Sequence, residues 1–299
     1  MTIRTLNDLV VLASGKERRI LAVAVAQDKD VLLAVKAASE AGLIAPVLIG
    51  DRQEIIESAR LSGLDISNME VMHIPDRHQA CVQAVRLARD NKAEILMKGM
   101  VSTGILMKAI LDKENGLMCG NALLSHVAFF ESPHYHKLLC ITDAALNISP
   151  DISEKVEIVN NAVKTLHKLG VPLPKVAILA AVETVNPKME ATLHAAMLVT
   201  MQRRKQITGC LIDGPLALDN AISAEAAHHK GIESEVAGDP DILVAPDLNS
   251  GNMLYKSLIF LGGAITAAMV VGASVPVVLT SRADSDRSKF LSIALAAAI

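Results

Sequence analysis

The sequence has very few aromatic side chains. Of its 299 residues only 2% are aromatic and none is Trp, whereas 51% are hydrophobic. A large core must therefore be built from Ala, Val, Ile, Leu and Met, a composition that suits Val/Ile strands covered by Ala/Leu helices. Binding of single-stranded nucleic acid by base stacking needs aromatic platforms, which this composition hardly supplies.

Clustered charge and paired cysteines are also missing. The net charge is −3, and the Lys and Arg residues form no stripe, so we expect no nucleic-acid partner. The first residues reach charge before an apolar stretch long enough for a signal peptide accumulates, which predicts no secretion signal. Without CxxC spacing, the cysteines predict reduced thiols of a cytoplasmic protein rather than a zinc or disulfide framework; they are Cys81, Cys119, Cys140 and Cys210.

One run, residues 257–281, contains no charge at all. It is longer than the ~20 residues that a membrane-spanning helix needs. However, Gly262, Gly263, Gly272 and Pro276 interrupt it. We therefore predict a buried Ala/Leu helix followed by a short strand, VPVVLT, and no membrane partner.

Short apolar strands alternate with helical segments along the chain. Helices are predicted over 30–42 and 153–170, and parallel sheets with right-handed crossovers are expected. The irregular, His-containing stretch that begins near residue 120 suggests a boundary. The predicted domains are residues 1–122 plus 284–299, which include a last helix over 284–299, and residues 123–283. Strands are predicted at 21–26, 45–50, 94–99, 137–143, 175–183, 209–214, 241–246 and 275–280.

Small, hydrogen-bonding or charged residues follow six of these strands. Open parallel sheets bind ligands beyond the carboxyl ends of their strands, so this shared edge is the predicted site. The six stretches are MVSTG, AALNIS, TVNPKM, GPLALDN, LNSGN and SRADSDR.

Three of the loops precede predicted helices, where free N–H groups can bind phosphate. They begin at Ser102, Asn249 and Ser281. Ser281 with Asp284 also fits a capping box, an ordinary structural motif, and both interpretations stay open. Arg282 favours the binding interpretation, because its planar donor fork suits phosphate or carboxylate.

Other chemistry-bearing motifs are missing or incomplete. There is no GxGxxG, GxxxxGK[ST] or GxSxG pattern, which argues against dinucleotide, P-loop and hydrolase sites. The histidines lack the carboxylates or cysteines of a metal site, so surface positions are expected; they are His134, His136, His228 and His229. A series of methionines predicts core filling or an apolar pocket wall: Met97, Met100, Met107 and Met118.

Six segments in order resemble the phosphate acyltransferase family, most closely its butyryltransferase branch. They are EILMKGMVSTGILMKAIL, KLLCITDAALNISPD, AILAAVETVNPKM, CLIDGPLALDNAIS, APDLNSGNMLYKSLIFLGGA and PVVLTSRADSD. The likeness runs from about residue 21 to the C-terminus. It implies two doubly wound α/β domains of the isocitrate and isopropylmalate dehydrogenase type, with the active site in the cleft between them.

The resemblance also implies the reaction: reversible transfer of a short-chain acyl group between coenzyme A and inorganic phosphate. Acyl-CoA, coenzyme A, phosphate and acyl phosphate are then the ligands, and no metal or redox cofactor takes part. Ser281 would hydrogen-bond the thiol or the oxyanion, and Arg282 would bind phosphate. The phosphate side would be completed by Lys98, Ser102, Thr103 and Lys108, the last standing where the family usually has Arg. The cleft would be lined from the other domain by Asn249, Ser250, Gly251 and Asn252.

The sequence departs from the family at the position of the general base. The family's acetyltransferase branch has its carboxylate at the position of Ser288 here, so Asp284 is our first candidate and Asp286 the reserve. Proton transfer from a thiol with a pKa of about 8.5 to an ordinary Asp of about 3.9 is uphill by about 6 kcal/mol. We therefore predict that Arg282, by stabilising the thiolate, contributes more than the base.

Alternative functions remain at this point. Phosphate acetyltransferase differs only in chain preference, because two buried methylenes are worth about 1.6 kcal/mol. An NAD-dependent decarboxylating hydroxy-acid dehydrogenase of the same fold needs a metal held by several carboxylates, whereas these loops supply mainly Asn and Ser. A non-catalytic binding module is disfavoured by the intact Ser281-Arg282 pair. The apolar tail FLSIALAAAI suggests packing against another subunit, and a homo-oligomer is predicted.

Overall fold

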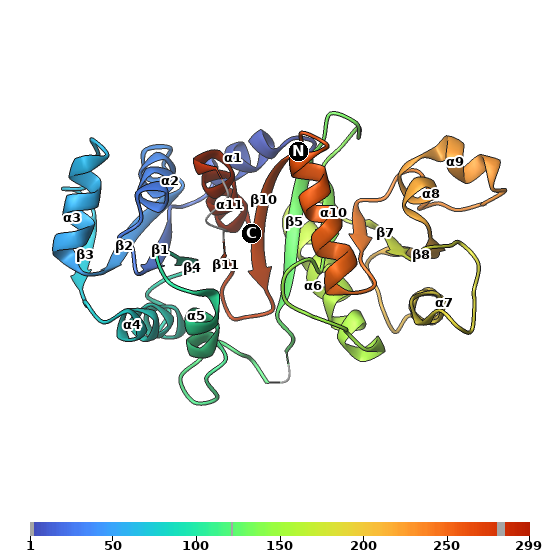
Figure 1. Ribbon diagram of the computed structural model, residues 1–299, viewed down its shortest axis with the longest axis horizontal. Helices are drawn as coiled ribbons and strands as arrows, with labels where there is room; N and C mark the ends of the chain where they lie inside the picture. The colour runs from blue at the N-terminus through green and yellow to red at the C-terminus, as the bar shows by residue number, and fades with distance from the viewer. Residues whose placement is uncertain (1–2, 121, 280–284) are drawn as a thin grey trace. The chain divides into compact units, whose positions relative to one another are not determined.

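The computed structural model describes residues 3–120, 122–279 and 285–299. It is an α/β protein whose chain divides into two compact units (Figure 1). Unit 1 contains the residues up to Leu6 and Leu123–Thr266, and unit 2 contains Asn7–Ala122 and Ala267–Ile299. The chain thus returns to unit 2 at Ala267, earlier than the predicted residue 284.

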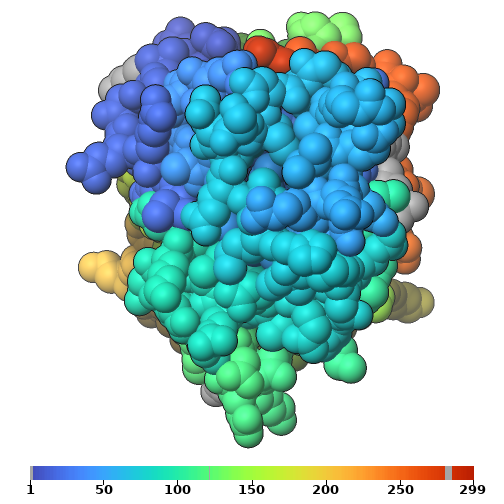
Figure 2. Space-filling model, turned by 90° about the vertical axis from the view of Figure 1, so that its left-hand side faces the viewer, coloured from blue at the N-terminus to red at the C-terminus, as the bar shows by residue number. Residues whose placement is uncertain are grey.

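In unit 2 the strands follow the order β3-β2-β1-β4-β11-β10. All neighbours pair in parallel except β10 and β11, which are antiparallel. The strands are β1 (Arg19–Ala24), β2 (Ile44–Gly50), β3 (Glu70–His73), β4 (Ile95–Lys98), β10 (Ile265–Val271) and β11 (Val277–Val278). The edge strand β3 lies on the face of unit 2 shown in Figure 2.

Helices cover both faces of this sheet: in Figure 1, α2 and α11 lie above it and α4 and α5 below. They are α1 (Leu6–Ser14), α2 (Lys29–Glu40), α3 (Arg52–Leu61), α4 (Arg77–Arg89), α5 (Thr103–Ile110) and α11 (Asp286–Ala298). An aspartate begins each of α2, α3 and α4, because its carboxylate accepts a backbone N–H of the first turn. Asp28 accepts from Val31 N at 3.0 Å and Asp76 from Gln79 N at 2.8 Å.

In unit 1 the strands follow the order β5-β6-β9-β7-β8. β5 and β6 are antiparallel and the others pair in parallel. The strands are β5 (Ser125–Glu131), β6 (Leu139–Thr142), β7 (Lys175–Leu179), β8 (Leu211–Leu216) and β9 (Ile242–Val244). The helices are α6 (Ile152–Lys168), α7 (Glu190–Arg203), α8 (Leu218–Ile222), α9 (Ala224–His229) and α10 (Leu248–Phe260).

The eight predicted strands are present, and so are the helices predicted over 30–42, 153–170 and 284–299, seen as α2, α6 and α11; three other expectations were wrong. β3 and β5 were not predicted, and the sheet pairing is mixed rather than wholly parallel. The uncharged run contains the end of α10 and then the strand β10, not an Ala/Leu helix. β10 escaped detection because it is buried on both faces after its first residue, so its sequence lacks the alternation of a half-exposed strand.

The apolar C-terminal tail is buried within its own chain. Every residue from Leu291 to Ala298 of α11 is buried, and the helix packs against α2. Its composition therefore gives no argument for another subunit, and the homo-oligomer stays a prediction. Among the described residues, no helix has both the length and the apolar character needed to cross a membrane.

Candidate functional site

The strand pairing of unit 2 brings three chain segments to one sheet edge. β4 pairs in parallel with β1, where Ala24 lies opposite Lys98, and with β11, where Val278 lies opposite Met97. The turn after β1, the loop after β4 and the chain after β11 therefore leave the sheet at the same carboxyl edge. The predicted residues Ser281, Arg282 and Asp284 follow β11 and lie outside the described residues.

Lys98 lies beneath the loop that follows β4. It is only 7% exposed, and its Nζ donates to Gly99 O at 3.2 Å and to Val101 O at 3.3 Å. These bonds hold the loop that leads into α5 and fix a positive charge under it. Nearby on α4, burial raises the pKa of the Cys81 thiol to about 11 although the charge of Lys98 acts to lower it. Cys81 is therefore a protonated core thiol, not a nucleophile.

Ser102 and Thr103 lie at the start of α5. Ser102 is the N-cap residue, but its side chain makes no capping hydrogen bond, and both residues are exposed. The hydroxyl of Ser102 and the first N–H groups of the helix thus face solvent, an arrangement that can accept an anion.

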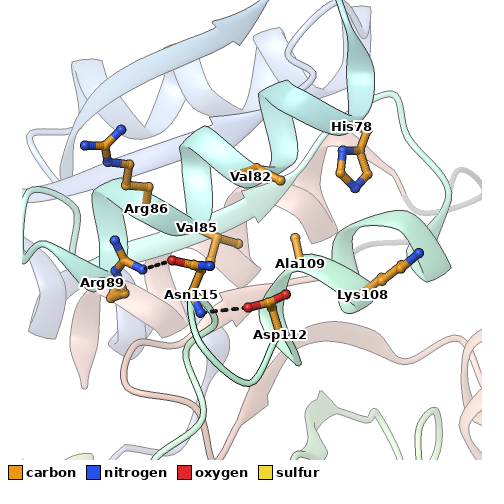
Figure 3. Close-up of a pocket in the computed structure, with 9 residues that line it drawn as sticks. All are labelled: His78, Val82, Val85, Arg86, Arg89, Lys108, Ala109, Asp112 and Asn115. Atoms are coloured by element: carbon orange, nitrogen blue, oxygen red, sulfur yellow. Dashed lines mark hydrogen bonds between the residues drawn. The ribbon is translucent and has the colours of Figure 1, made fainter.

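Lys108, in the last turn of α5, lines a cavity between α4 and α5 of about 560 Å³ (Figure 3). Basic side chains lie at both ends of this cavity: Arg86 and Arg89 at one end, and Lys108 with the imidazole of His78 at the other. Arg89 Nη1 donates to Asn115 Oδ1 at 2.7 Å, which fixes that guanidinium in the wall. Asp112 is the carboxylate among the lining residues, and Asp90 pairs with Arg86 at 3.7 Å and with Arg89 at 3.5 Å. The positive charge available to an anionic ligand is therefore greatest at the Lys108 end.

The start of α11 differs from the prediction. The helix begins at Asp286, and its N-cap is Ser285, whose Oγ accepts from Ser288 N at 3.2 Å. The N-cap is thus four residues after Ser281, where a capping box was considered. Asp286 is exposed in the first turn, and whether it or Asp284 acts as a base stays a prediction.

In unit 1, the buried carboxylate of Asp143 organises the loop after β6. It is 3% exposed and accepts four hydrogen bonds of 2.7–3.0 Å. The donors are His126 N, Ala145 N, Leu146 N and Asn147 Nδ2. Asp143 was not among the predicted site residues, although an aspartate immediately after a buried strand is a signal that the sequence contains.

The predicted residues Asn249, Ser250, Gly251 and Asn252 lie together in the first turns of α10. The carboxylate of Asp247 caps this helix by accepting Ser250 N at 2.9 Å and Ser250 Oγ at 3.0 Å. Asn252 Nδ2 donates to Ala144 O at 3.0 Å. Asn252 therefore holds α10 against the Asp143 loop and Ser250 completes the helix cap, whereas Asn249 is exposed.

Gly251 allows this close approach. A Cβ added there would lie 2.4 Å from Asp143 O, so a side chain would push α10 away from the loop.

The histidines that could suggest a metal lie on the surface. His134, His136, His228 and His229 are exposed, and His136 Nε2 lies 2.9 Å from Asp239 Oδ1. In the part of the chain that the structure describes, no three His, Cys, Asp or Glu side chains come together to hold an ion. Of the methionines, Met97 is fully buried and Met100 is 42% exposed.

The fold and the polar carboxyl edges define an α/β protein with anion-binding features, and comparisons with known proteins identify its family. The model of the phosphate acetyl/butaryl transferase family matches residues 76–297. The chain belongs to this family.

Three relatives illustrate the similarity. The chain is 46% identical to phosphate butyryltransferase of Clostridium acetobutylicum, over 99% of this chain and 98% of that one. It is 43% identical to phosphate acetyltransferase of Thermotoga maritima, over 98% of each. The crystal structure of a branched-chain phosphotransacylase from Enterococcus faecalis matches with a TM-score of 0.83 and 37% sequence identity. The match covers 94% of this chain and 98% of that one.

The loop after β4 depends on Gly99, which gives a first prediction. A Cβ at Gly99 would lie 2.1 Å from Val25 O, and the backbone N–H groups of Gly99 and Met100 donate to Ala24 O and Val25 O. Gly99→Ala should lower the free energy of unfolding by about 1–3 kcal/mol.

Urea denaturation followed by circular dichroism measures this effect. Gly104→Ala is the matched control, because nothing lies within 4 Å of a Cβ there and Ala favours a helix by up to about 1 kcal/mol. Equal stability of the two variants would contradict the role given to Gly99.

Proposed function

We propose that this protein catalyses reversible transfer of a short-chain acyl group, butyryl in the first place, between coenzyme A and inorganic phosphate. The observation that carries the proposal is the 46% identity to a phosphate butyryltransferase along nearly the whole of both chains. A phosphate oxygen attacks the thioester carbonyl, the C–S bond breaks, and the CoA thiolate leaves; the reverse reaction forms the thioester from acyl phosphate. We expect no metal or redox cofactor in this chemistry.

The residue roles belong to the same proposal. Ser281 hydrogen-bonds the sulfur or the oxyanion, and Arg282 binds phosphate and offsets the charge that develops. The register supports this, because β11 delivers the chain to the edge where Lys98 and the loop before Ser102 and Thr103 lie. The first turns of α10 contribute Asn249 to Asn252 to substrate binding. The isocitrate dehydrogenase-like fold is part of the same proposal and rests on the family resemblance.

A second candidate is phosphate acetyltransferase, because relatives with that name are 43% identical over nearly the full length. The two activities share every step and differ only in the acyl pocket. The alternative dehydrogenase activity would be seen as reduction of NAD with a hydroxy acid.

Acyl preference and activity can be measured together. We expect CoA release from butyryl-CoA to require added phosphate, and kcat/KM to exceed that for acetyl-CoA by about tenfold if the two extra methylenes are buried. The thiol released from acetyl-, propionyl-, butyryl- and isobutyryl-CoA is titrated with a chromogenic disulfide. Release without phosphate, or none from any thioester, would sink the proposed function; a preference for acetyl-CoA would favour the second candidate.

Single substitutions test whether charge stabilisation by Arg282 contributes more to the rate than proton transfer to an aspartate. Arg282→Ala should reduce kcat/KM about 10²–10³-fold, the loss typical of a removed oxyanion donor, and Asp284→Ala or Asp286→Ala less than about tenfold. Rates are measured in both directions. Arg287→Ala is the matched control: this exposed arginine in the first turn of α11 lies 5.9 Å from the Phe290 ring. A larger loss for either aspartate variant would reverse the ranking.

Lys108 is proposed to attract phosphate as a point charge at the cavity between α4 and α5. Lys108→Met should raise the KM for phosphate about tenfold, while Lys108→Arg keeps the charge and stays near the parent value. Lys113→Met, an exposed lysine in the loop after α5, controls for general loss of surface charge. An unchanged KM for phosphate in Lys108→Met would remove Lys108 from the phosphate site.

A further inference from the structure

The polar loop AALNIS after β6 lies at the carboxyl edge of unit 1 and is fixed by the carboxylate of Asp143. Oδ1 of this carboxylate accepts the backbone N–H groups of Ala145 and Leu146 at 2.7 and 2.9 Å. Oδ2 accepts His126 N of β5 at 3.0 Å and Asn147 Nδ2 at 2.7 Å. One buried side chain thus closes the loop on itself and ties it to the neighbouring strand.

Two hydrogen bonds join this loop to the first turns of α10. Leu248 N donates to Ile148 O at 3.1 Å, and Asn252 Nδ2 donates to Ala144 O at 3.0 Å. The first bond holds the first residue of the helix, and the second holds a side chain four residues further on. Together they fix both the starting point and the direction of α10, and with them the exposed Asn249 that lies between.

The helix and the loop are also in direct contact at Gly251. A Cβ there would lie 2.4 Å from Asp143 O and 3.2 Å from Ala144 Cα. Gly251 is the one buried residue of α10, so the first turns of the helix depend on these contacts more than on burial of apolar side chains. Further along, the ring of Tyr255 packs edge-on against Phe130 of β5, with the ring centroids 5.2 Å apart. The place of the first turns is therefore set at the loop.

We propose that Asp143 is a positioning residue for acyl transfer: by fixing the loop after β6, it holds the first turns of α10 where they bind the acyl-CoA substrate. The inference rests on the proposed function, in which Asn249 to Asn252 bind substrate and residues of unit 2 form the phosphate side. Asp143 is 3% exposed, so it acts through the loop and not by touching substrate. Its loss weakens binding of acyl-CoA and leaves binding of phosphate unchanged.

The substitution Asp143→Asn tests this role. It keeps the size of the side chain, but its amide group places two N–H donors where a carboxylate oxygen accepted two hydrogen bonds. In either orientation of the amide, donors then face donors. We expect the KM for butyryl-CoA to rise about tenfold, with kcat and the KM for phosphate within about twofold of the parent values. Phosphate-dependent CoA release is measured with each substrate varied in turn while the other is saturating.

Asp241→Asn is the matched control for this substitution. Asp241 accepts Lys137 Nζ at 2.6 Å and Lys175 N at 2.7 Å, at the amino ends of the strands of the same unit. The control therefore also removes a hydrogen-bonded carboxylate oxygen, but at the opposite edge of the sheet. Both KM values should stay near those of the parent. Urea denaturation of both variants shows that each is folded under the assay conditions.

The same contact can be disturbed from the helix side without removing a polar group. Because a Cβ at position 251 collides with Asp143 O, Gly251→Ala pushes α10 off the loop. We expect the same selective rise in the KM for butyryl-CoA. Asp143→Asn and Gly251→Ala combined should raise this KM by less than the product of the two single effects, because both act on one contact.

The outcomes separate the two proposals. A parent enzyme that releases no CoA with phosphate removes the proposed function itself. An active parent in which Asp143→Asn leaves the KM for butyryl-CoA unchanged, or raises the KM for phosphate as much, overturns only the positioning role. If Asp143→Asn does not fold, Gly251→Ala decides by the same criterion, together with Asn147→Ala, which removes one of the four hydrogen bonds to the carboxylate.

Discussion

Parallel pairing of β4 with β1 and β11 is the constraint on which the unit 2 part of the site depends. Parallel strands end at the same edge, so the pairs Ala24 with Lys98 and Val278 with Met97 bring distant parts of the chain together. The backbone bonds from Gly99 and Met100 to the turn after β1 then fix the loop before α5. A side chain at Gly99 would collide with that turn. Site geometry here follows from sheet register before any catalytic side chain is considered.

In unit 1, carboxylates that accept several hydrogen bonds fix the loops at the carboxyl ends of the strands. Asp143 accepts four hydrogen bonds within its loop, and Asp247 caps α10, which packs on that loop through Gly251 and Asn252. A carboxylate that accepts several N–H groups can be buried because its bonds replace water. By contrast, Lys137 and Lys175 pair with Asp239 near the amino ends of the strands, at the edge opposite the predicted site.

The sequence predicted strands best where an apolar run was bounded by turn residues, as at 45–50 and 241–246. It failed at β10, where Ala and Thr buried on both faces give no period, and at β5, where a histidine and a glutamate made a strand look irregular. Ser102 and Asn249 could be chosen because each lies in a loop after a strand, whereas Lys98, the last residue of β4, was chosen from the family resemblance. Asp143 could have been chosen on the same rule.

The pair formed by the buried Lys155 and His194, whose Nζ and Nδ1 lie 2.9 Å apart, lay beyond reach of that rule, for a physical reason. Lys155 and His194 lie 39 positions apart on different helices. Lysine and histidine are both common on solvent-facing helix surfaces, so neither residue type marks a buried pair. Only the packing of α6 beside α7 makes them partners and removes the water that would otherwise set their charges independently. The sequence can identify functional side chains in loops that directly follow predicted strands. A pair of side chains whose protonation changes because two helices exclude water from it can be recognised only from distances in the folded structure, since the contact itself causes the change.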